Sequence, residues 1–450
     1  MENRRLFGTD GVRGLANQYP MTTEMVTRIG MAAGSLLKKG AHRNRVIIAK
    51  DTRLSGYMIE NALTAGFLSV GIDVMLVGPM PTPAVSMLIR AMRADMGVMI
   101  SASHNPYHDN GLKIFNHLGL KLEDEVEEQV QNIVNQRDLN HLLASAENIG
   151  RAKRLDDAAG RYVEYAKYTF PKEQNLDGLK MVLDCANGSA YHLAPTIFWE
   201  LGADVTKIAC EPNGFNINKD CGAMHPQELA QQVKQHHADI GIALDGDADR
   251  IVACDEHGHI IHGDHLIAAI ATYLHQHRKL KNESVVLTHM SNMALEHYLN
   301  SLGLKVWRTK VGDRHVFKKM QEEKCLLGAE QSGHIIYSKC ATTGDGVVAA
   351  LALLAYIREH NVTASSIHKL FKLYPQMLKN IRYQGNSPLD SPEIQQKIEA
   401  LKSKHPDYRF LIRPSGTEDL VRVMVEGPEQ EQIEILATTV VGYLDSRFSS

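Results

Sequence analysis

The sequence predicts an α/β protein built from several domains, and three observations lead to this prediction. Its 450 residues exceed what one hydrophobic core holds, since cores stop growing at roughly 250 to 300 residues. A plan of strand, helix and second strand occurs three times along the chain. The last part of the chain lacks this plan. We therefore expect three related α/β domains with mixed sheets, followed by a smaller α+β domain.

Each of the three repeats has an apolar strand, a loop, an amphipathic helix and a second strand led by glycine. Continuous apolar strands that alternate with helices are typical of βαβ units whose sheets are buried on both faces. The expected strand pairs are 46–51 with 71–77, 181–185 with 202–205, and 285–288 with 303–307.

The tail predicts a hairpin of Arg409 to Ile412 with Leu420 to Glu426, and then a helix over 429–444. The stretch 374–392 holds three prolines with Gly385 and Asn386, so we expect a linker there. The last domain boundary is accordingly placed near Pro375. The expected domains are residues 1–155, 156–257, 258–374 and 375–450.

Composition excludes several classes of protein. Apolar residues make up 44% and charged residues 22% of the chain, and the formal net charge is -3. Such values are ordinary for globular proteins. A net charge of this size provides no broad basic surface, so no nucleic-acid partner is expected. The first residues carry no apolar run, and no stretch approaches the ~20 apolar residues of a membrane helix. We expect a cytoplasmic protein without a membrane partner, whose six cysteines are free thiols.

The first candidate site is the loop Ser101 to Pro106, which follows the apolar strand Met96 to Ile100. Small residues and Asn-Pro favour a tight loop, and α/β sheets place reactive groups at the carboxyl ends of their strands. Ser103 is therefore a candidate nucleophile, with Ser101 expected to face the opposite way. A serine-rich turn that caps itself is the alternative.

The second candidate is the loop Leu244 to Arg250, with carboxylates at Asp245, Asp247 and Asp249. In near-extended backbone, side chains at this spacing point to one side, and converging oxygen ligands suit Mg²⁺ or Ca²⁺. An EF-hand is excluded because Arg250 occupies the position that requires glycine. The remaining alternative is a solvated acidic turn without metal.

A third loop, Leu327 to His334, offers a carboxylate, a hydroxyl and an imidazole between glycines. This set can hydrogen-bond the hydroxyls of a sugar, although a plain surface loop has the same composition. A fourth loop, Arg413 to Glu418, combines an arginine with two hydroxyls and a Ser-Gly-Thr turn. These groups suit a dianionic phosphate, and the alternative is an ordinary hairpin turn with an exposed arginine.

Several common sites are absent from the sequence. It contains no GxGxxG, no GxxxxGK[ST] and no HExxH segment, so dinucleotide, P-loop and zincin sites lack their usual motifs. His257, His259 and His262 lie close together, but without cysteine and in a turn that contains glycine. We expect these histidines to be exposed rather than bound to zinc.

Taken together and in order, five segments resemble the α-D-phosphohexomutase superfamily. They are FGTDGVRG (7–14), SASHNP (101–106), DGDADR (245–250), EQSGH (330–334) and RPSGTE (413–418). Within the superfamily, the first segment, DCANG (184–188) and TTGDG (342–346) are similar to the branch that acts on glucosamine phosphates. The chain departs from several relatives at 311–314, where VGDR replaces a Gly-His pair and leaves the role of Asp313 unassigned.

The resemblance implies a fold of three α/β domains and a fourth, TATA-binding-protein-like domain around a central cleft. It also implies a set of site residues. The catalytic residues would be Ser103, which becomes phosphorylated, with Arg13, Lys113 and His104. The metal ligands would be Ser103, Asp245, Asp247 and Asp249. The substrate-binding residues would be Arg250, Glu330, Ser332, His334, Arg413, Ser415, Gly416 and Thr417.

The implied activity is the interconversion of glucosamine 6-phosphate and glucosamine 1-phosphate, which feeds UDP-N-acetylglucosamine and cell-wall synthesis. The implied cofactors are one Mg²⁺ per chain, the phosphate on Ser103, and glucosamine 1,6-bisphosphate as intermediate and activator. The partner would be a small phosphosugar, and the chain a monomer or homodimer. A phosphomutase for glucose or mannose is the first alternative. A non-catalytic protein that binds sugar phosphates is the second, and Ser103, Lys113 and the three aspartates argue against it.

Overall fold

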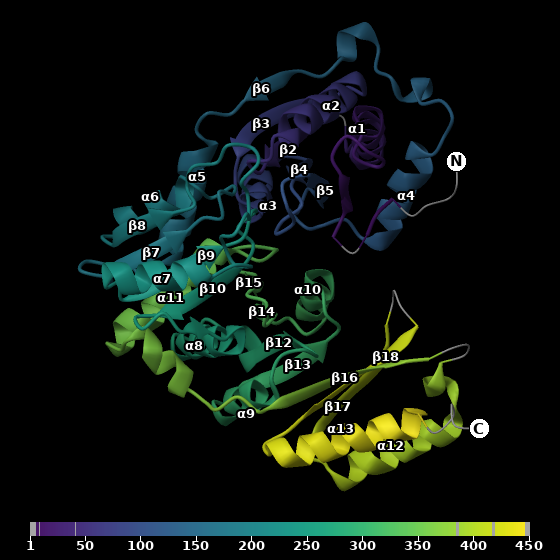
Figure 1. Cartoon of the computed structure of the whole chain (residues 1–450). Helices are drawn as coiled ribbons and strands as arrows, with labels where there is room; N and C mark the ends of the chain where they lie inside the picture. Colours follow the sequence, from purple (N-terminus) through teal and green to yellow (C-terminus); the bar gives the residue numbers. More distant parts are fainter. Residues whose placement is uncertain (1–5, 9, 41, 384–386, 416–418, 446–450) are drawn as a thin grey trace.

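The computed structural model describes residues 6–8, 10–40, 42–383, 387–415 and 419–445. Within these residues the strands form four sheets, which follow one another along the chain (Figure 1). The first three sheets are covered by helices and lie together, whereas the fourth lies at the side of the third. The predicted α/β class with a smaller last domain is confirmed.

The first sheet has six strands in the order β1-β5-β4-β2-β3-β6. Parallel pairs join β2 to β3 and β4, and antiparallel pairs join β5 to β1 and β4, so the sheet is mixed. The strands are β1 Val12–Leu15, β2 Arg45–Lys50, β3 Asp73–Pro79, β4 Met96–Ile100, β5 Asp109–Asn116 and β6 Ala152–Arg154. The helices of this domain are α1 Thr23–Leu37, α2 Ser55–Ser69, α3 Thr82–Met92 and α4 Asp124–Val134.

The second and third sheets have the orders β11-β10-β9-β7-β8 and β13-β12-β14-β15. Their strands are β7 Lys180–Asp184, β8 Asp204–Ile208, β9 Ile240–Leu244, β10 Ile251–Asp255, β11 Ile260–Ile261, β12 Ser284–Thr288, β13 Lys305–Thr309, β14 Leu327–Ala329 and β15 Ile335–Tyr337. Their helices are α5 Ala158–Thr169, α6 Leu193–Glu200, α7 Gln227–His236, α8 Gly263–Gln276, α9 Met293–Ser301, α10 Asp313–Glu322 and α11 Gly346–His360.

The three predicted strand-helix-strand repeats are confirmed. They correspond to β2-α2-β3, β7-α6-β8 and β12-α9-β13, and the two strands of each repeat pair in parallel. Short 3₁₀ helices lie between the main elements at Asn140–Leu142, Ala146–Asn148, Lys281–Glu283, Ala364–Lys369 and Pro388–Asp390.

The fourth sheet has the order β16-β18-β17, with strands β16 Gln376–Arg382, β17 Arg409–Pro414 and β18 Leu420–Glu426. The linker expected over 374–392 is wrong, because β16 pairs along its whole length with β18. Met377 and Ile381 lie on the same face of β16, because side chains in a strand alternate between its two faces, and both pack against the core of this domain. The neighbouring prolines obscured this pattern in the sequence. Pro392 opens helix α12 Pro392–Lys404, where a missing N–H costs little. Helix α13 Gln430–Asp445 follows the sheet.

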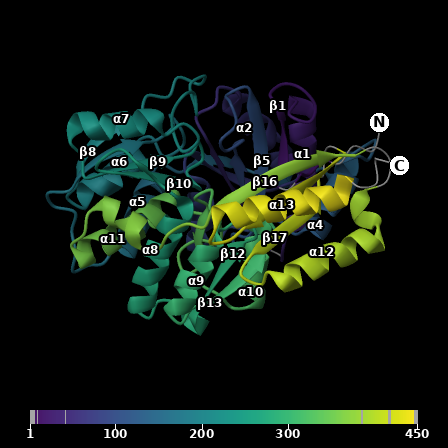
Figure 2. The same ribbon diagram turned by 60° about the horizontal axis from the view of Figure 1, so that its bottom comes forward.

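One hydrophobic core runs through the second and third domains to the face of the first sheet that packs against α3. The other face of the first sheet has a separate core, and the fourth domain has a core of its own. Helices α12 and α13 cover one face of the fourth sheet (Figure 2). Polar contacts attach this domain to the third. Arg409 donates to the carbonyl of Ser291 at 2.9 Å, and the Met293 N–H donates to Glu426 at 2.9 Å.

Two further expectations concern cysteines and membrane spans. All six cysteines are free, four of them buried, as expected. Across the described ranges, none of the helices combines the length and the apolar character needed to cross a bilayer.

Asp345 provides a test of the packing between the second and third domains. Its carboxylate caps α11 by accepting the N–H groups of Val347 and Val348 at 3.1 and 3.0 Å, and it accepts the buried hydroxyl of Tyr162 at 3.0 Å. Asp345→Ala should lower the free energy of unfolding by about 2 kcal/mol or more, because it removes the cap and leaves that hydroxyl unpaired. Urea denaturation followed by circular dichroism measures this. Equal midpoints for this variant and the exposed control Asp157→Ala would contradict it.

Candidate active site

Ser103 lies in the loop after β4 and is 2% exposed. Its hydroxyl donates a hydrogen bond to Asp245 Oδ2 at 2.7 Å, across the boundary between the first and second domains. The Nδ1 atom of His104 lies 3.4 Å from the same hydroxyl. Burial, followed by the positive charges of Arg250 and Arg13, lowers the pKa of His104. This lowered pKa favours the neutral form of the imidazole beside the Ser103 hydroxyl.

The neighbouring hydroxyl of Ser101 is occupied elsewhere. It donates to Asp51 Oδ2 at 2.6 Å and accepts the N–H of Ser103 at 2.9 Å. Strand alternation does not explain why the two side chains diverge, because residues two apart in a strand share a face. Ser103 instead has a left-handed backbone, with φ +50°, which turns its side chain towards the second domain.

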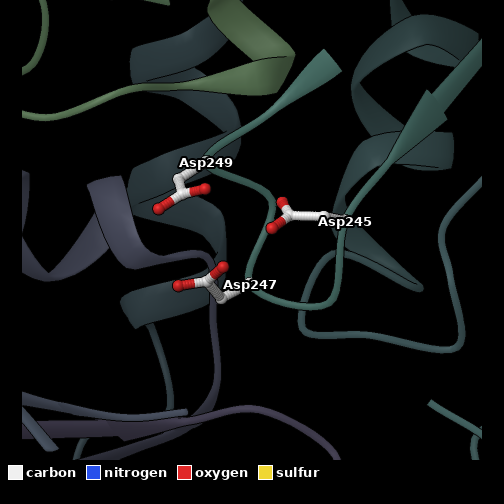
Figure 3. Close-up of side chains that lie close together, drawn as sticks. All are labelled: Asp245, Asp247 and Asp249. Atoms are coloured by element: carbon white, nitrogen blue, oxygen red, sulfur yellow. The ribbon is translucent and has the colours of Figure 1, made fainter. Parts of the chain in front are cut away.

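The acidic loop between β9 and β10 brings its three aspartates together (Figure 3). One ligand atom from each of Asp245, Asp247 and Asp249 lies within 4.8 Å of the others, and all three residues are buried. The near-extended backbone expected for this loop is wrong. A turn is closed by the Ala248 N–H, which donates to the Asp245 carbonyl at 3.0 Å, and Ala248 has φ +56°. The turn, rather than strand geometry, gathers the carboxylates.

Lys113 on β5 balances part of this negative charge. Its ammonium lies 2.7 Å from Asp247 Oδ2, 3.1 Å from Asp249 Oδ2 and 3.4 Å from Asp10. Burial alone would lower the pKa of Lys113, but these carboxylates hold it well above its usual value. Burial likewise opposes ionisation of Asp249, and Lys113 nevertheless holds the pKa of Asp249 well below its usual range. Lys113 is therefore a fixed cation of the site.

The remaining oxygens of the aspartates fit a divalent cation. Asp247 Oδ1 and Asp249 Oδ1 are buried, and no described residue hydrogen-bonds to either of them. Burial, and then the charges of Asp249 and Asp247, raise the pKa of Asp245. Burial of carboxylate charge that no cation compensates costs free energy. A bound Mg²⁺ or Ca²⁺ would compensate it, and both ions prefer oxygen ligands. Thr82 orients one ligand by donating to Asp247 Oδ2 at 2.5 Å.

Residues from the loop between β14 and β15 border the aspartates. His334 is buried, with Nδ1 3.6 Å from Asp249 Oδ1, and its Nε2 accepts the N–H of Gly344 at 3.0 Å. Glu330 accepts the N–H of Gly312 at 2.9 Å. Ser332 is exposed at the tip of the loop. Polar groups suited to a sugar thus lie next to the candidate metal ligands.

Two glycines of the third domain pack closely against the acidic loop and the first residue of β10. A Cβ on Gly333, where φ is +87°, would lie 2.0 Å from the Ile251 carbonyl oxygen. A Cβ on Gly344, in the TTGDG segment, would lie 2.5 Å from the Asp249 carbonyl oxygen. Only glycine permits such an approach, so the second and third domains present their loops as one unit.

A second cluster of charges was missed by the sequence analysis. Arg13 pairs with Asp10, and Asp10 also pairs with Lys121 on the edge of the first domain. Lys121 lies 2.5 Å from Asp313 of the third domain, which gives the previously unassigned Asp313 a partner. Asp10 belongs to the FGTDGVRG segment, but no spacing in the sequence indicated that Lys121 would join it. The ion pair between Lys121 and Asp313 connects the first and third domains, which are far apart in the sequence.

The candidate phosphate-binding residues lie on the fourth domain. Arg413 is exposed on β17, and Ser415 follows this strand. Gly416 and Thr417 lie outside the described residues.

The side chain of Arg250 is close to the acidic loop, 3.9 Å from Asp249, while its N–H donates to Asp245 at 3.2 Å. His257, His259 and His262 are exposed, as expected.

Comparisons with known proteins agree along the whole chain. Four profiles of the phosphoglucomutase/phosphomannomutase family match it: α/β/α domain I at residues 4–141, domain II at 160–258, domain III at 262–374 and the C-terminal domain at 378–442. The chain is 51% identical over 440 residues to a phosphoglucosamine mutase of Chelativorans sp., covering 98% of this chain and 97% of the relative. The chain belongs to this family, in its phosphoglucosamine mutase branch.

Other relatives support the same assignment. A phosphoglucosamine mutase of Paramagnetospirillum magneticum is 53% identical over 442 residues, which cover 97% of this chain and 98% of the relative. A phosphoglucomutase/phosphomannomutase family protein of Burkholderia thailandensis has a TM-score of 0.82 at 22% identity, covering 99% and 98% of the two chains. Aspergillus fumigatus N-acetylphosphoglucosamine mutase, in complex with GlcNAc-6P and magnesium, has a TM-score of 0.64 at 18% identity, covering 97% and 95%. These structures show the fold.

The acidic cluster predicts that the chain binds one divalent cation. Asp247→Asn removes one charge from the cluster and should weaken Mn²⁺ binding about tenfold or more, because the remaining ligands keep less charge. Electron paramagnetic resonance of free Mn²⁺ measures this without substrate. Asp204→Asn, at an exposed position on β8, is the control and should bind as the wild type does. Equal dissociation constants for the two variants would contradict the metal site.

Proposed function

We propose that the chain interconverts glucosamine 6-phosphate and glucosamine 1-phosphate through a phosphoserine at Ser103. The observation that carries this proposal is the 2.7 Å contact between the Ser103 hydroxyl and Asp245, inside a buried cluster of carboxylates and cations. The membership in the phosphoglucosamine mutase branch supports the choice of sugar. Ser103 therefore carries the phosphate in transit.

In the first half of the reaction, the bond between phosphorus and the Ser103 oxygen breaks while a sugar hydroxyl forms a new bond to phosphorus. The proton that leaves this hydroxyl replaces the phosphoryl group on the Ser103 oxygen, so the products are a bisphosphate and a free Ser103 hydroxyl. In the second half, the Ser103 oxygen attacks the other phosphate, the bond from that phosphorus to the sugar oxygen breaks, and the freed sugar oxygen takes up a proton while Ser103 becomes phosphorylated again. His104 is the proposed acceptor of the Ser103 proton, because its lowered pKa favours the neutral ring, and only the neutral ring can accept a proton.

Phosphoryl transfer depends mainly on alignment and on neutralising the charge of the transferred group. Mg²⁺, when bound by Asp245, Asp247, Asp249 and the phosphoserine, supplies part of that neutralisation. Lys113, Arg13 and Arg250 supply the rest from the protein. Lys113 is held charged by its buried carboxylates, so its cation is permanent.

The sugar is proposed to bind Glu330, Ser332 and His334 through its hydroxyl groups. A substrate ammonium at C2 would form a charge-assisted hydrogen bond with Glu330, which is stronger than a bond to a neutral hydroxyl by roughly 1 to 2 kcal/mol. The phosphate that does not react is assigned to Arg413, Ser415, Gly416 and Thr417.

The bisphosphate must turn around so that its second phosphate reaches Ser103. Both phosphates then use the same residues of the fourth domain in succession. The separate core of this domain, together with its polar attachment at Ser291 and Met293, supports a movement of the domain during this exchange.

The remaining parts of the proposal follow from the same activity. The chain would use one Mg²⁺ and glucosamine 1,6-bisphosphate as activator, act in the cytoplasm as a monomer or homodimer, and supply UDP-N-acetylglucosamine for the cell wall. The proposed domains are 1–155, 156–257, 258–374 and 375–450.

The choice of sugar is tested by comparing kcat/KM for the glucosamine, glucose and mannose phosphates under the same Mg²⁺ and bisphosphate concentrations. We expect glucosamine phosphate to be preferred by about tenfold or more, since each 1.4 kcal/mol corresponds to a factor of ten. Glu330→Gln keeps an acceptor for the Gly312 N–H and removes the charge, so it should reduce the preference to about threefold or less.

Glu322→Gln, an exposed position on α10, is the matched control and should keep the full preference. Equal or faster turnover of glucose or mannose phosphate by the wild type would assign the chain to a sibling activity. An unchanged preference in Glu330→Gln would remove Glu330 from the recognition of the amino group.

A further inference from the structure

Two side chains from different domains converge on the main-chain carbonyl of Ser103. Arg53 of the first domain donates to this oxygen from Nη2 at 2.9 Å, and Asn218 of the second domain donates from Nδ2 at 2.8 Å. The same two side chains also share the carbonyl of Asn105, at 2.8 and 3.1 Å. The loop that carries Ser103 is thus bound from both sides of the domain boundary.

Arg53 is held rigidly in the first domain. Its side chain is fully buried, and its Nε donates to Asp51 Oδ2 at 2.7 Å. Asp51 in turn accepts the hydroxyl of Ser101, which accepts the N–H of Ser103. The N–H and the carbonyl of Ser103 are therefore fixed by one connected network, which stabilises a backbone conformation that residues other than glycine rarely adopt.

Asn218 brings the second domain into this network. Its backbone N–H donates to the Ala186 carbonyl at 2.9 Å, and the residue is 7% exposed. Gly246 of the acidic loop packs against the same point, since a Cβ there would lie 2.6 Å from the Ser103 carbonyl oxygen and 2.8 Å from Asn218 Nδ2. The Ser103 carbonyl is enclosed by Arg53, Asn218 and the turn that gathers the aspartates.

We propose that Asn218 is a positioning residue for phosphoryl transfer, acting through the Ser103 carbonyl, with Arg53 as its counterpart in the first domain. This inference rests on the proposed function of Ser103. Asn218 touches neither the hydroxyl nor the aspartate oxygens in the structure. It sets the distance between the Ser103 loop and the acidic loop, so that the hydroxyl meets Asp245 when the two domains are together.

Two substitutions at Asn218 remove the amide donor of the side chain and leave the backbone conformation of the residue unchanged. Asn218 has φ +57°, which aspartate and glycine both tolerate. Asn218→Asp keeps the shape and places an acceptor against two carbonyl oxygens, whereas Asn218→Gly removes the side chain. Asn282→Asp is the matched control, because Asn282 also has a left-handed backbone, φ +62°, and donates to two carbonyls, of Glu323 and Lys324, in the third domain.

The experiment measures the rate of Ser103 phosphorylation from the sugar bisphosphate, by intact mass, together with kcat and KM for the full-length chain. Both Asn218 variants should lower the phosphorylation rate and kcat by about tenfold or more, because small errors in alignment are costly for transfer. KM should stay within about twofold of the wild type. The control should match the wild type in all three quantities.

Unchanged phosphorylation in a folded Asn218 variant would overturn the inference, and so would a higher KM at unchanged kcat. If Asn218→Asp does not fold, Asn218→Gly decides. A wild-type chain that takes up no phosphate on Ser103 would instead overturn the proposed function, so the two failures are distinguishable.

Discussion

The structure depends on keeping three buried carboxylates within 4.8 Å of one another. Asp245, Asp247 and Asp249 repel each other in a medium that screens charge poorly, so their arrangement requires cations held in fixed positions. Lys113 provides one cation from the first domain, and the Oδ1 atoms of Asp247 and Asp249, to which no described residue hydrogen-bonds, can ligate another. A single domain does not satisfy this requirement, because the aspartates lie on the second domain, whereas Lys113 and Ser103 lie on the first.

The boundaries between domains are therefore part of the site. Gly333 and Gly344 press the third domain against the acidic loop, and Lys121 joins Asp313 to the first domain. These contacts explain how loops far apart in the sequence reach one position. The fourth domain differs, because its own core and its polar attachment leave Arg413 on a separate body. Three domains joined by such contacts and a fourth with its own core suit the proposed reaction, in which the bisphosphate turns around.

The sequence indicated much of this architecture, for physical reasons that can be named. The apolar strands and the glycine after each helix predicted the repeats, since periodicity follows from local backbone geometry. β16 was missed because its weak alternation lies between prolines. The carboxylates were found by their spacing, but the turn at Ala248 was not. Lys121 and Asn218 could not be found, because their partners lie more than a hundred residues away and only tertiary contacts bring them together.

The central claim is that Ser103 alone carries the transferred phosphate. The most direct measurement is the intact mass of the purified chain after incubation with Mg²⁺ and the sugar bisphosphate, followed by peptide mapping. We expect one added phosphate, located on Ser103, that is absent from Ser103→Ala and retained in Ser101→Ala. Phosphate on Ser101, or wild-type turnover by Ser103→Ala, would contradict it.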